Sequence, residues 1–437
     1  MLLMCNRMLP TVTGPMTQRM AEQGSGAMRD TNVAGASGNA EAQWQRTLWG
    51  IQFVMTGAFS MLSPIMPLFL PVLGVDSASA VALWAGVLAG TTSFVAAFAS
   101  PLWGRLADRH GRKLMLLRSS IAVGVFAALM GASANVWQVF ACRALMGVFA
   151  GFSSTAIALV ASQAPEERLG YALGWLSTGQ LVGSLVGPLI GGFLADATGS
   201  YRIPFYCTAA TIMVMTGFVW FGVHERFVPT AQARGGRALL SGLIAVARSP
   251  GLLALFFVLL MAQFGVRTVQ PVVTLFVKEL LGDRPDLATL SGIAFSITGL
   301  ANVVATPFLG NKSDKIGYRR VLLIALLGAS LTTLPQAFAD SYWIFTAQRF
   351  AVGLFIGGIL PAANALVGRL VPREQRGTVY GITASAMFLG NSIGPLSGGA
   401  VAAAFGLRWV FLMTGAVLLA NLLWVYYRVP EYVERKG

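Results

Sequence analysis

The sequence predicts an all-α polytopic membrane protein whose twelve transmembrane helices form two pseudo-symmetric six-helix bundles. Three observations predict this fold. Hydrophobic residues make up 55% of the 437-residue chain and charged residues only 11%, against about 25% in soluble globular domains. Twelve apolar runs are each long enough to cross a bilayer, which takes about 20 residues. The second six runs repeat motifs of the first six, so the chain contains two copies of one unit.

The twelve runs divide into two equal sets. They cover residues 48–70, 80–103, 114–134, 136–160, 170–195 and 203–223 in the first half, and 250–277, 288–309, 320–338, 342–367, 378–404 and 408–428 in the second. The longest polar connection separates the halves. The predicted order is a disordered cytoplasmic tail (1–43), an N-terminal bundle (44–223), a cytoplasmic linker (224–249), a C-terminal bundle (250–428) and a cytoplasmic tail (429–437).

The N-terminal tail and the cysteines add little chemistry. The apolar start of the tail is cut short by polar side chains, which argues against a signal peptide. Cys5 lies in the tail, and Cys142 and Cys207 lie inside apolar runs, so we expect free thiols and no metal site.

The net charge of +14 records membrane orientation. With both termini in the cytoplasm, the segments on that side hold 23 Lys and Arg residues, whereas the loops on the other side hold only Arg202, Lys278, Arg284 and Arg408. The positive-inside rule therefore predicts cytoplasmic termini, and the ten tryptophans near span ends fit an interfacial aromatic belt. We expect a multi-pass protein of the cell inner membrane, and the positive charge gives no support for nucleic-acid binding.

An internal repeat relates the two halves at an offset of 206–207 residues. The matched positions are Gly104, Asp108 and Gly111 with Gly310, Asp314 and Gly317; Arg143 and Gly147 with Arg349 and Gly353; and Gly187-Pro188 with Gly394-Pro395. Each half has an even number of spans, so both copies share one orientation and are related by an axis along the membrane normal. Two such halves around a central site are typical of transporters in which one half rocks against the other.

The turn between the second and third spans reads Gly104-Arg-Leu-Ala-Asp108-Arg109-His-Gly111-Arg112-Lys113. Gly104 allows a close approach of the second span to another helix, and Gly111 permits a tight turn. Asp108 can accept hydrogen bonds from Arg112 or from the amides at a helix N-terminus.

This turn resembles the signature loop of the major facilitator superfamily, and the resemblance covers about 390 residues, all but the tail. Within the superfamily, the run from Gly111 to Arg118 is similar to the MdtG-like multidrug resistance proteins of the drug:proton antiporter branch. The resemblance implies that Asp108 engages the facing helix of the other half when the transporter is open outward. The implied cytoplasmic latch comprises Gly104, Asp108, Arg109, Gly111, Arg112, Asp314 and Arg319.

The fourth span carries an arginine in the pattern Arg143-x-x-x-Gly147-x-x-x-Gly151. Arg143 lies ~10 Å from the outer end of the span at 1.5 Å per residue, and such a costly residue favours a functional role. The family resemblance links Arg143, together with Asp108, to proton coupling. The alternative is a structural arginine bonded to backbone carbonyls, which the second copy at Arg349 favours.

The fifth span carries Gly183-x-x-x-Gly187-Pro188-x-x-Gly191-Gly192. Glycines four residues apart form a smooth ridge for close helix contact, and Pro188 bends the helix. This pattern resembles the antiporter motif that separates drug:proton exporters from uptake members of the superfamily. Ordinary small-residue packing is the alternative, and the second copy in the eleventh span supports it.

The span interiors contain no Asp, Glu or His. The first span lacks the carboxylate with which some multidrug exporters bind cationic drugs, so neutral or anionic amphiphiles fit better. Arg267, just before Pro271 in the seventh span, either binds an anionic group of the substrate or snorkels to the outer interface.

The family resemblance places the substrate cavity among spans 1, 4, 7 and 10, with contributions from spans 2, 5, 8 and 11. The candidate substrate-binding residues are Phe53, Met55, Phe59, Met146, Phe149, Gln180, Gln263, Phe264, Arg267, Phe355, Asn364 and Asn391, with Asn302 and Met387 beside them. Met and Phe adapt to varied ligands, but helix packing also explains each of them.

The function predicted from these features is secondary active multidrug efflux, in which amphiphilic drugs are exchanged for protons by alternating access. An exporter or importer of one specific metabolite is the alternative on the same fold. The sequence has no set of polar residues at membrane depth that an intramembrane enzyme would need, which argues against that class. It also has no phosphate-binding loop, which argues against transport driven by ATP. The expected partners are small amphiphilic molecules, protons and the lipid bilayer, with a monomeric chain and no cofactor.

Overall fold

The computed structural model describes residues 47–163, 169–223, 225, 249–370 and 376–429, and this part of the chain is helical without a strand. The first half contains the span Thr47–Phe69, which ends in α2 (Ile65–Phe69), and then η1 (Pro71–Leu73), α3 (Ala78–His110), α4 (Arg112–Ala132), α5 (Val136–Val148), α6 (Phe152–Gln163), α7 (Leu169–Thr198) and α8 (Ile203–Gly222). The second half contains α10 (Pro250–Thr268), α11 (Val273–Leu281), α12 (Leu287–Ile316), α13 (Tyr318–Thr333), η3 (Leu334–Phe338), α14 (Tyr342–Leu370), α15 (Arg376–Phe405) and α16 (Leu407–Arg428).

These helices confirm the predicted all-α architecture of twelve spans. Eleven spans are long and apolar enough to cross a membrane. The twelfth is α15, a helix of 30 residues, which is long enough to cross a membrane. Its Gly, Ser and Asn residues make it less apolar than the other eleven. The predicted tail 1–43, most of the linker 224–249 and residues 430–437 lie outside the described residues.

The fourth span, predicted as one run, is two helices, α5 and α6. Gly151 between them has a φ of 128°, a backbone conformation that side chains other than hydrogen disfavour. Arg118 of α4 donates hydrogen bonds to the carbonyl oxygens of Phe149 and Ala150 at the break, both at 3.3 Å. Its guanidinium carbon also lies 3.3 Å from the ring centroid of Trp103. Arg118 thus satisfies carbonyl groups that the interrupted helix leaves free inside the membrane.

Two repeat-related prolines interrupt the first and seventh spans. Pro64 immediately precedes α2, and Pro271 lies between α10 and α11. The two interruptions meet, because the Thr274 hydroxyl donates a hydrogen bond to the carbonyl oxygen of Pro64 at 3.2 Å. The breaks therefore join the two halves as well as bending each span.

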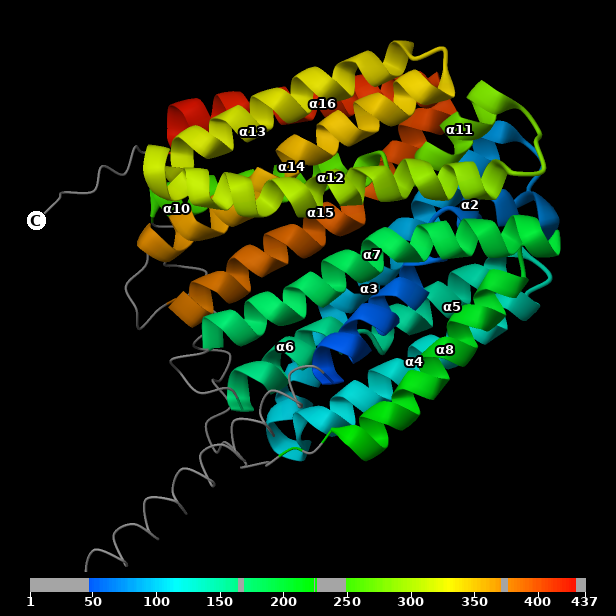
Figure 1. Cartoon of the computed structure of the whole chain (residues 1–437), viewed down its shortest axis with the longest axis horizontal. Coiled ribbons are helices and arrows are strands. Elements are labelled where there is room, and N and C mark those ends of the chain that lie inside the picture. The colour runs from blue at the N-terminus through cyan, green and yellow to red at the C-terminus, as the bar shows by residue number, and fades with distance from the viewer. Residues whose placement is uncertain (1–46, 164–168, 224, 226–248, 371–375, 430–437) are drawn as a thin grey trace, which may run out of the picture.

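The helices run between two ends of the molecule, and the halves lie side by side, with α7 and α15 along their boundary (Figure 1). The linker end holds the turns at Gly111 and Gly317 and the residues that flank the linker, Glu225 and Ser249. The opposite end holds the turns at Gly74, Gly199, Gly282 and Gly406.

Three hydrophobic cores show where the halves join. One core combines side chains of both halves, including Phe69 and Phe205 from the first and Phe276 and Phe411 from the second. Each of these two ring pairs has its centroids 5.0 Å apart, close enough for a favourable aromatic contact. The other two cores each stay within one half. The shared core includes the residues that border the opposite end, so the halves pack together there.

Candidate functional site

The glycines of the predicted antiporter motif pack α7 against the first span of the same half. A Cβ atom added at Gly183, Gly187 or Gly191 would collide with the backbone of the span Thr47–Phe69. The second copy in α15 packs in the same way against α10. Close helix packing therefore accounts for these glycines in both halves, and the antiporter role stays a prediction.

Gly192 and Pro188 of this motif face the other half. A Cβ atom at Gly192 would collide with the backbone of α12, and one at Gly292 would collide with the carbonyl oxygen of Pro188. On the other side of the interface, a Cβ atom at Gly86 would collide with the carbonyl oxygen of Pro395. The halves thus meet backbone to backbone along two helix pairs, α7 with α12 and α3 with α15.

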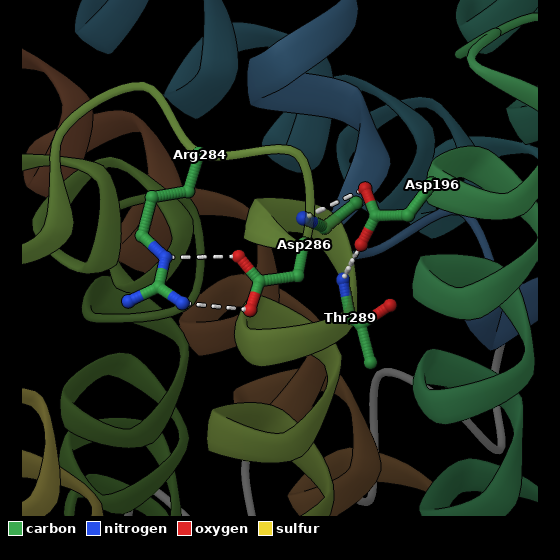
Figure 2. A network of polar contacts seen from close by, with 5 residues as sticks. Asp196, Arg284, Asp286 and Thr289 are labelled. Carbon is green, nitrogen blue, oxygen red and sulfur yellow. Dashed lines mark hydrogen bonds and ion pairs between the residues drawn. The ribbon is translucent and has the colours of Figure 1, made fainter.

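Hydrogen bonds reinforce the contact between α7 and α12. The Ser296 hydroxyl donates to the carbonyl oxygen of Leu185 at 2.5 Å. The Asp196 carboxylate accepts hydrogen bonds from the backbone N–H groups of Ala288 and Thr289 at 3.2 and 2.7 Å (Figure 2). These bonds and the glycine contacts hold the two halves together near the opposite end, the end of the molecule away from the linker.

The linker end of the same helix pairs is different. Among the described residues, no heavy atom of a neighbouring element lies within 4 Å of a Cβ built at Gly104 of α3, Gly174 of α7 or Gly310 of α12. The close approach expected for Gly104 is therefore absent from this state. The side chains of its motif partners Asp108 and Asp314 lie outside what the structure describes.

The other predicted latch residues make contacts inside their own halves. Gly111 has a φ of 94° and forms the expected tight turn. The backbone N–H of Arg112 donates to the Glu225 carboxylate at 2.9 Å, and Arg319 donates from Nη2 to the carbonyl oxygen of Tyr426 at 2.6 Å. Arg109 is exposed. A latch between the halves thus stays a prediction for another state of the cycle.

A cavity of about 230 Å³ lies between the halves, beside the contacts of the opposite end. Its apolar wall includes Phe59, Leu62, Met66, Ala85 and Pro395, and its polar groups come from Ser63, Thr92, Ser93, Arg143, Arg267, Gln270 and Asn391. Among the described residues that line it, two arginines are the charged groups and none is acidic. Each half supplies one arginine.

Arg143 enters this cavity from α5 with unused hydrogen-bonding capacity. The residue is only 9% exposed, and its buried Nε has no hydrogen-bond partner within the described part of the chain. Its guanidinium carbon lies 5.9 Å from the ring centroid of Phe59, and its carbonyl oxygen accepts a hydrogen bond from Thr92. Because a buried charged donor without an acceptor is costly, this geometry favours an acceptor supplied by a bound molecule.

Arg267 reaches the cavity from α10 and is held by two amides. Its Nε donates to Asn391 Oδ1 at 3.0 Å, and its Nη1 donates to Gln270 Oε1 at 3.1 Å. Both partners are neutral, so they orient the guanidinium and leave its charge uncompensated. Arg349, the repeat copy of Arg143, instead donates from Nε to the carbonyl oxygen of Ala294 at 3.4 Å and is not among the cavity residues. The repeat pair therefore divides into one cavity arginine and one structural arginine.

The cavity contains some of the predicted binding residues, namely Phe59, Arg267 and Asn391, together with the predicted coupling residue Arg143. Sequence reasoning missed Gln270, although it lies one helical turn after Arg267. It also missed Thr92 and Ser93, whose small hydroxyl groups give no signal in an apolar run.

Several other candidates do not line the cavity. Met55 and Met146 are 5% and 1% exposed and lie in hydrophobic cores, so their role in substrate binding stays a prediction. Phe355 and Met387 pack against the core of the second half, and Phe149 packs on Trp103. The remaining candidates outside the lining are Phe53, Gln180, Gln263, Phe264, Asn302 and Asn364. These residues were chosen without knowledge of helix orientation, because composition predicts a span but not which face of the helix turns toward the cavity.

Two six-helix halves around a central cavity define a membrane transporter. The family model of the Major Facilitator Superfamily matches residues 48–289 and 255–437, and the chain belongs to this family. It is therefore a multi-pass membrane transporter and not an enzyme.

Particular relatives cover most of the chain. The Multidrug resistance protein MdtG of Dickeya zeae is 38% identical over 403 residues, which are 91% of this chain and 98% of the relative. The protein of the same name from Yersinia enterocolitica is 38% identical over 390 residues, 88% of this chain and 93% of the relative. A solved bacterial homolog of the human lysosomal transporter Spinster, in an inward-facing and unoccupied conformation, has a TM-score of 0.70 at 15% identity and covers 89% of this chain and 97% of its own. That structure shows the shared fold.

Proposed function

We propose that the chain is a proton-coupled multidrug exporter of the cell inner membrane, which moves amphiphilic small molecules outward by alternating access. Relatives named as multidrug resistance proteins, similar over about nine-tenths of the chain, support the export of drugs. The positive-inside pattern supports cytoplasmic termini and thus a cytoplasmic linker end. The transporting unit in this proposal is a monomer, because each chain supplies both halves of the cavity.

The observation that carries the substrate proposal is the pair of arginines in the cavity. Arg143 and Arg267 come from different halves and face the same space, and no acidic residue lines it among those described. Apolar side chains fill much of the remaining wall, so the preferred substrates are amphiphiles with an apolar body and a carboxylate, sulfonate or phosphate group. Cationic drugs meet two like charges and bind less well.

The proposed coupling uses groups at the linker end. Asp108 ionises and docks on the other half when the linker end closes, as the family resemblance implies, and Asp314 with Arg319 forms the second copy. Arg143 connects the cavity to this step, because its charge lies where the substrate binds. Proton binding at Asp108 then changes the balance between the two states of the transporter.

The test is transport in proteoliposomes with an imposed pH gradient, using anilinonaphthalene sulfonate as the anionic probe and ethidium as the cationic probe. The expected result is gradient-driven movement of the sulfonate, lost in Asp108→Asn and weakened about tenfold in KM by Arg267→Gln, since a charge-assisted hydrogen bond is lost. Transport unaffected by collapse of the gradient contradicts proton coupling. Preference for ethidium contradicts the substrate class.

A second candidate function is exchange of one specific anionic metabolite. The cavity volume of about 230 Å³ favours it, since sites for drug-sized ligands occupy about 300–1,000 Å³. Deleting the gene and screening resistance against a broad panel of toxic compounds separates the two. Sensitivity to several unrelated amphiphiles supports multidrug export, and unchanged resistance to all of them supports the metabolite.

A further inference from the structure

We propose that Asp196 is a positioning residue of the transport cycle, which holds the opposite end closed by binding the N-terminus of α12 across the two halves. The proposal rests on the alternating access of the proposed function, because a latch matters only if this end opens. Asp196 lies in the last turn of α7 in the first half, whereas α12 is the second span of the second half.

The geometry is that of a helix cap supplied from another domain. The two Asp196 carboxylate oxygens accept one backbone N–H each, from Ala288 and Thr289 in the first turn of α12. These N–H groups have no partner inside their own helix, and the positive end of a 30-residue helix favours a negative charge there. Bonds from N–H groups to an ionised carboxylate are stronger than bonds between neutral groups.

The residue expected to cap α12 does not do so. Asp286 occupies the N-cap position, but its side chain makes no cap hydrogen bond. Its carboxylate is held instead by Arg284, whose Nε and Nη2 donate to the two oxygens at 3.0 and 3.1 Å (Figure 2). The diversion of Asp286 leaves the first turn of α12 available to Asp196.

Two other helices, α3 and α5, are capped by a residue of their own chain segment. Ser77 accepts from the N–H of Ala80 at the start of α3, which is the repeat counterpart of α12. Asn135 accepts from the N–H of Gln138 at the start of α5. The cap of α12 therefore differs from these local caps in joining two bodies that must move relative to each other.

The charges around Asp196 leave its carboxylate to the helix. Lys278 pairs with Asp283 at 2.7 Å and Arg284 pairs with Asp286, so these two cations are engaged with other carboxylates. Burial and the charges of Asp196 and Asp283 raise the pKa of the Tyr201 phenol, against an opposing effect of Lys278, so this phenol offers Asp196 no positive charge. Among the described residues, Asp196 is therefore paired with the positive N-terminal end of α12.

Opening the opposite end separates α7 from α12 and breaks this cap. Both N–H groups and the carboxylate must then be hydrated, so the ionised Asp196 stabilises the state in which this end is closed. Asparagine at this position keeps one acceptor oxygen but loses the charge and the second acceptor. Glutamate keeps the charge on a longer side chain.

The experiment measures the distance between spin labels at Tyr171 of α7 and Phe308 of α12, which are exposed on the linker side. The full chain, without its native cysteines, is studied in liposomes with no substrate and no pH gradient. Asp196→Asn is expected to raise the ratio of short to long distances about tenfold, because the linker end closes when the opposite end opens. Asp196→Glu is expected to restore most of the wild-type ratio.

The matched control is Asp286→Asn, which removes the carboxylate at the N-cap position of α12 and leaves the Asp196 carboxylate in place. The proposal is overturned if Asp196→Asn gives the wild-type ratio, or if Asp286→Asn shifts the ratio equally. Monodisperse elution and an unchanged helical circular dichroism spectrum exclude misfolding as the cause of a shift. A shift in Asp196→Asn without transport of any probe refutes the proposed function and leaves the latch standing.

Discussion

The two ends of the interface between the halves use the same helices and behave differently. On the side of the opposite end, Gly192 and Gly86 lie so close to the other half that no side chain fits. On the linker side, Gly104 and Gly310 have no neighbour within 4 Å of an added Cβ in the part of the chain that the structure describes. The shared hydrophobic core lies with the crowded glycines, and the separate cores lie within the halves. One end of the transporter is therefore closed and the other is separated.

This difference suggests why glycines occur at the separated linker end, where packing in the present state does not require them. A glycine is costly in a helix interior, by up to about 1 kcal/mol relative to alanine, unless a close contact compensates. Gly104, Gly174 and Gly310 have no such contact with any described residue in this state. We expect contact with the other half, in the state in which the linker end is closed, to compensate for this cost. The glycines of the opposite end would then join the halves in one state of the cycle, and those of the linker end would join them in the other.

The largest effect is expected from Gly192→Leu. Its side chain collides with the backbone of α12, which cannot move without separating the halves. Overpacking of this kind costs about 3 kcal/mol, so the closed opposite end becomes roughly a hundredfold less populated. Spin-label distances across the linker end measure the change. Gly217→Leu in α8 is the control, because no described residue lies within 4 Å of a Cβ built at that position.

Gly310→Leu is expected to act in the other direction by about tenfold. The new side chain has room in the present state, so it adds no strain here. It obstructs the close approach that the linker end needs in the other state, and the present state becomes more populated. Transport falls in both glycine variants while the distance distributions move oppositely. A shift of Gly310→Leu in the same direction as Gly192→Leu contradicts the exchange of contacts.

Sequence reasoning predicted the fold well because its signals are regular. Span length, the position of charges and the repeat all follow from the bilayer, so twelve helices in two halves could be derived before any coordinates. The antiporter glycines were also predicted to form a ridge, since spacing by four residues places them on one helix face. The local break at Gly151 was not predicted, because an apolar run gives no sign of an interruption that a distant Arg118 supports.

The candidate site was harder to predict than the fold. Arg143 and Arg267 were found because a charge inside a span is rare. Met55 and Met146, predicted as binding residues, lie in hydrophobic cores here, since the sequence does not distinguish an apolar side chain that faces a cavity from one that faces a core. Asp196 was not predicted to have a role, because it stands near a span end, where an acid is ordinary. Its importance depends on a helix start about ninety residues away, which only the three-dimensional arrangement reveals.

A smaller effect is expected from removing one polar bond of the closed interface. Ser296→Ala deletes the hydroxyl that donates to Leu185, at a cost of about 1 kcal/mol, or roughly fivefold in the ratio of the two states. Thr306→Val on the same helix is the control, because its hydroxyl donates to Asn302 and Gly357, which both belong to its own half. Distance measurements in both variants test the difference. Equal shifts indicate that α12 itself, and not its contact with α7, determines the ratio.

The smallest effect on the balance of states is expected from Glu225→Gln, although its chemistry matches that of Asp196. The Glu225 carboxylate accepts the backbone N–H groups of Arg112 and Lys113 at 2.9 and 2.7 Å and caps α4 within the first half. Losing the charge lowers the free energy of unfolding by about 1 kcal/mol, which a thermal unfolding curve measures. The ratio of the two states stays at its wild-type value, because α4 and residue 225 move as one body. A change in that ratio as large as in Asp196→Asn means that helix capping as such, and not its position between the halves, controls the cycle.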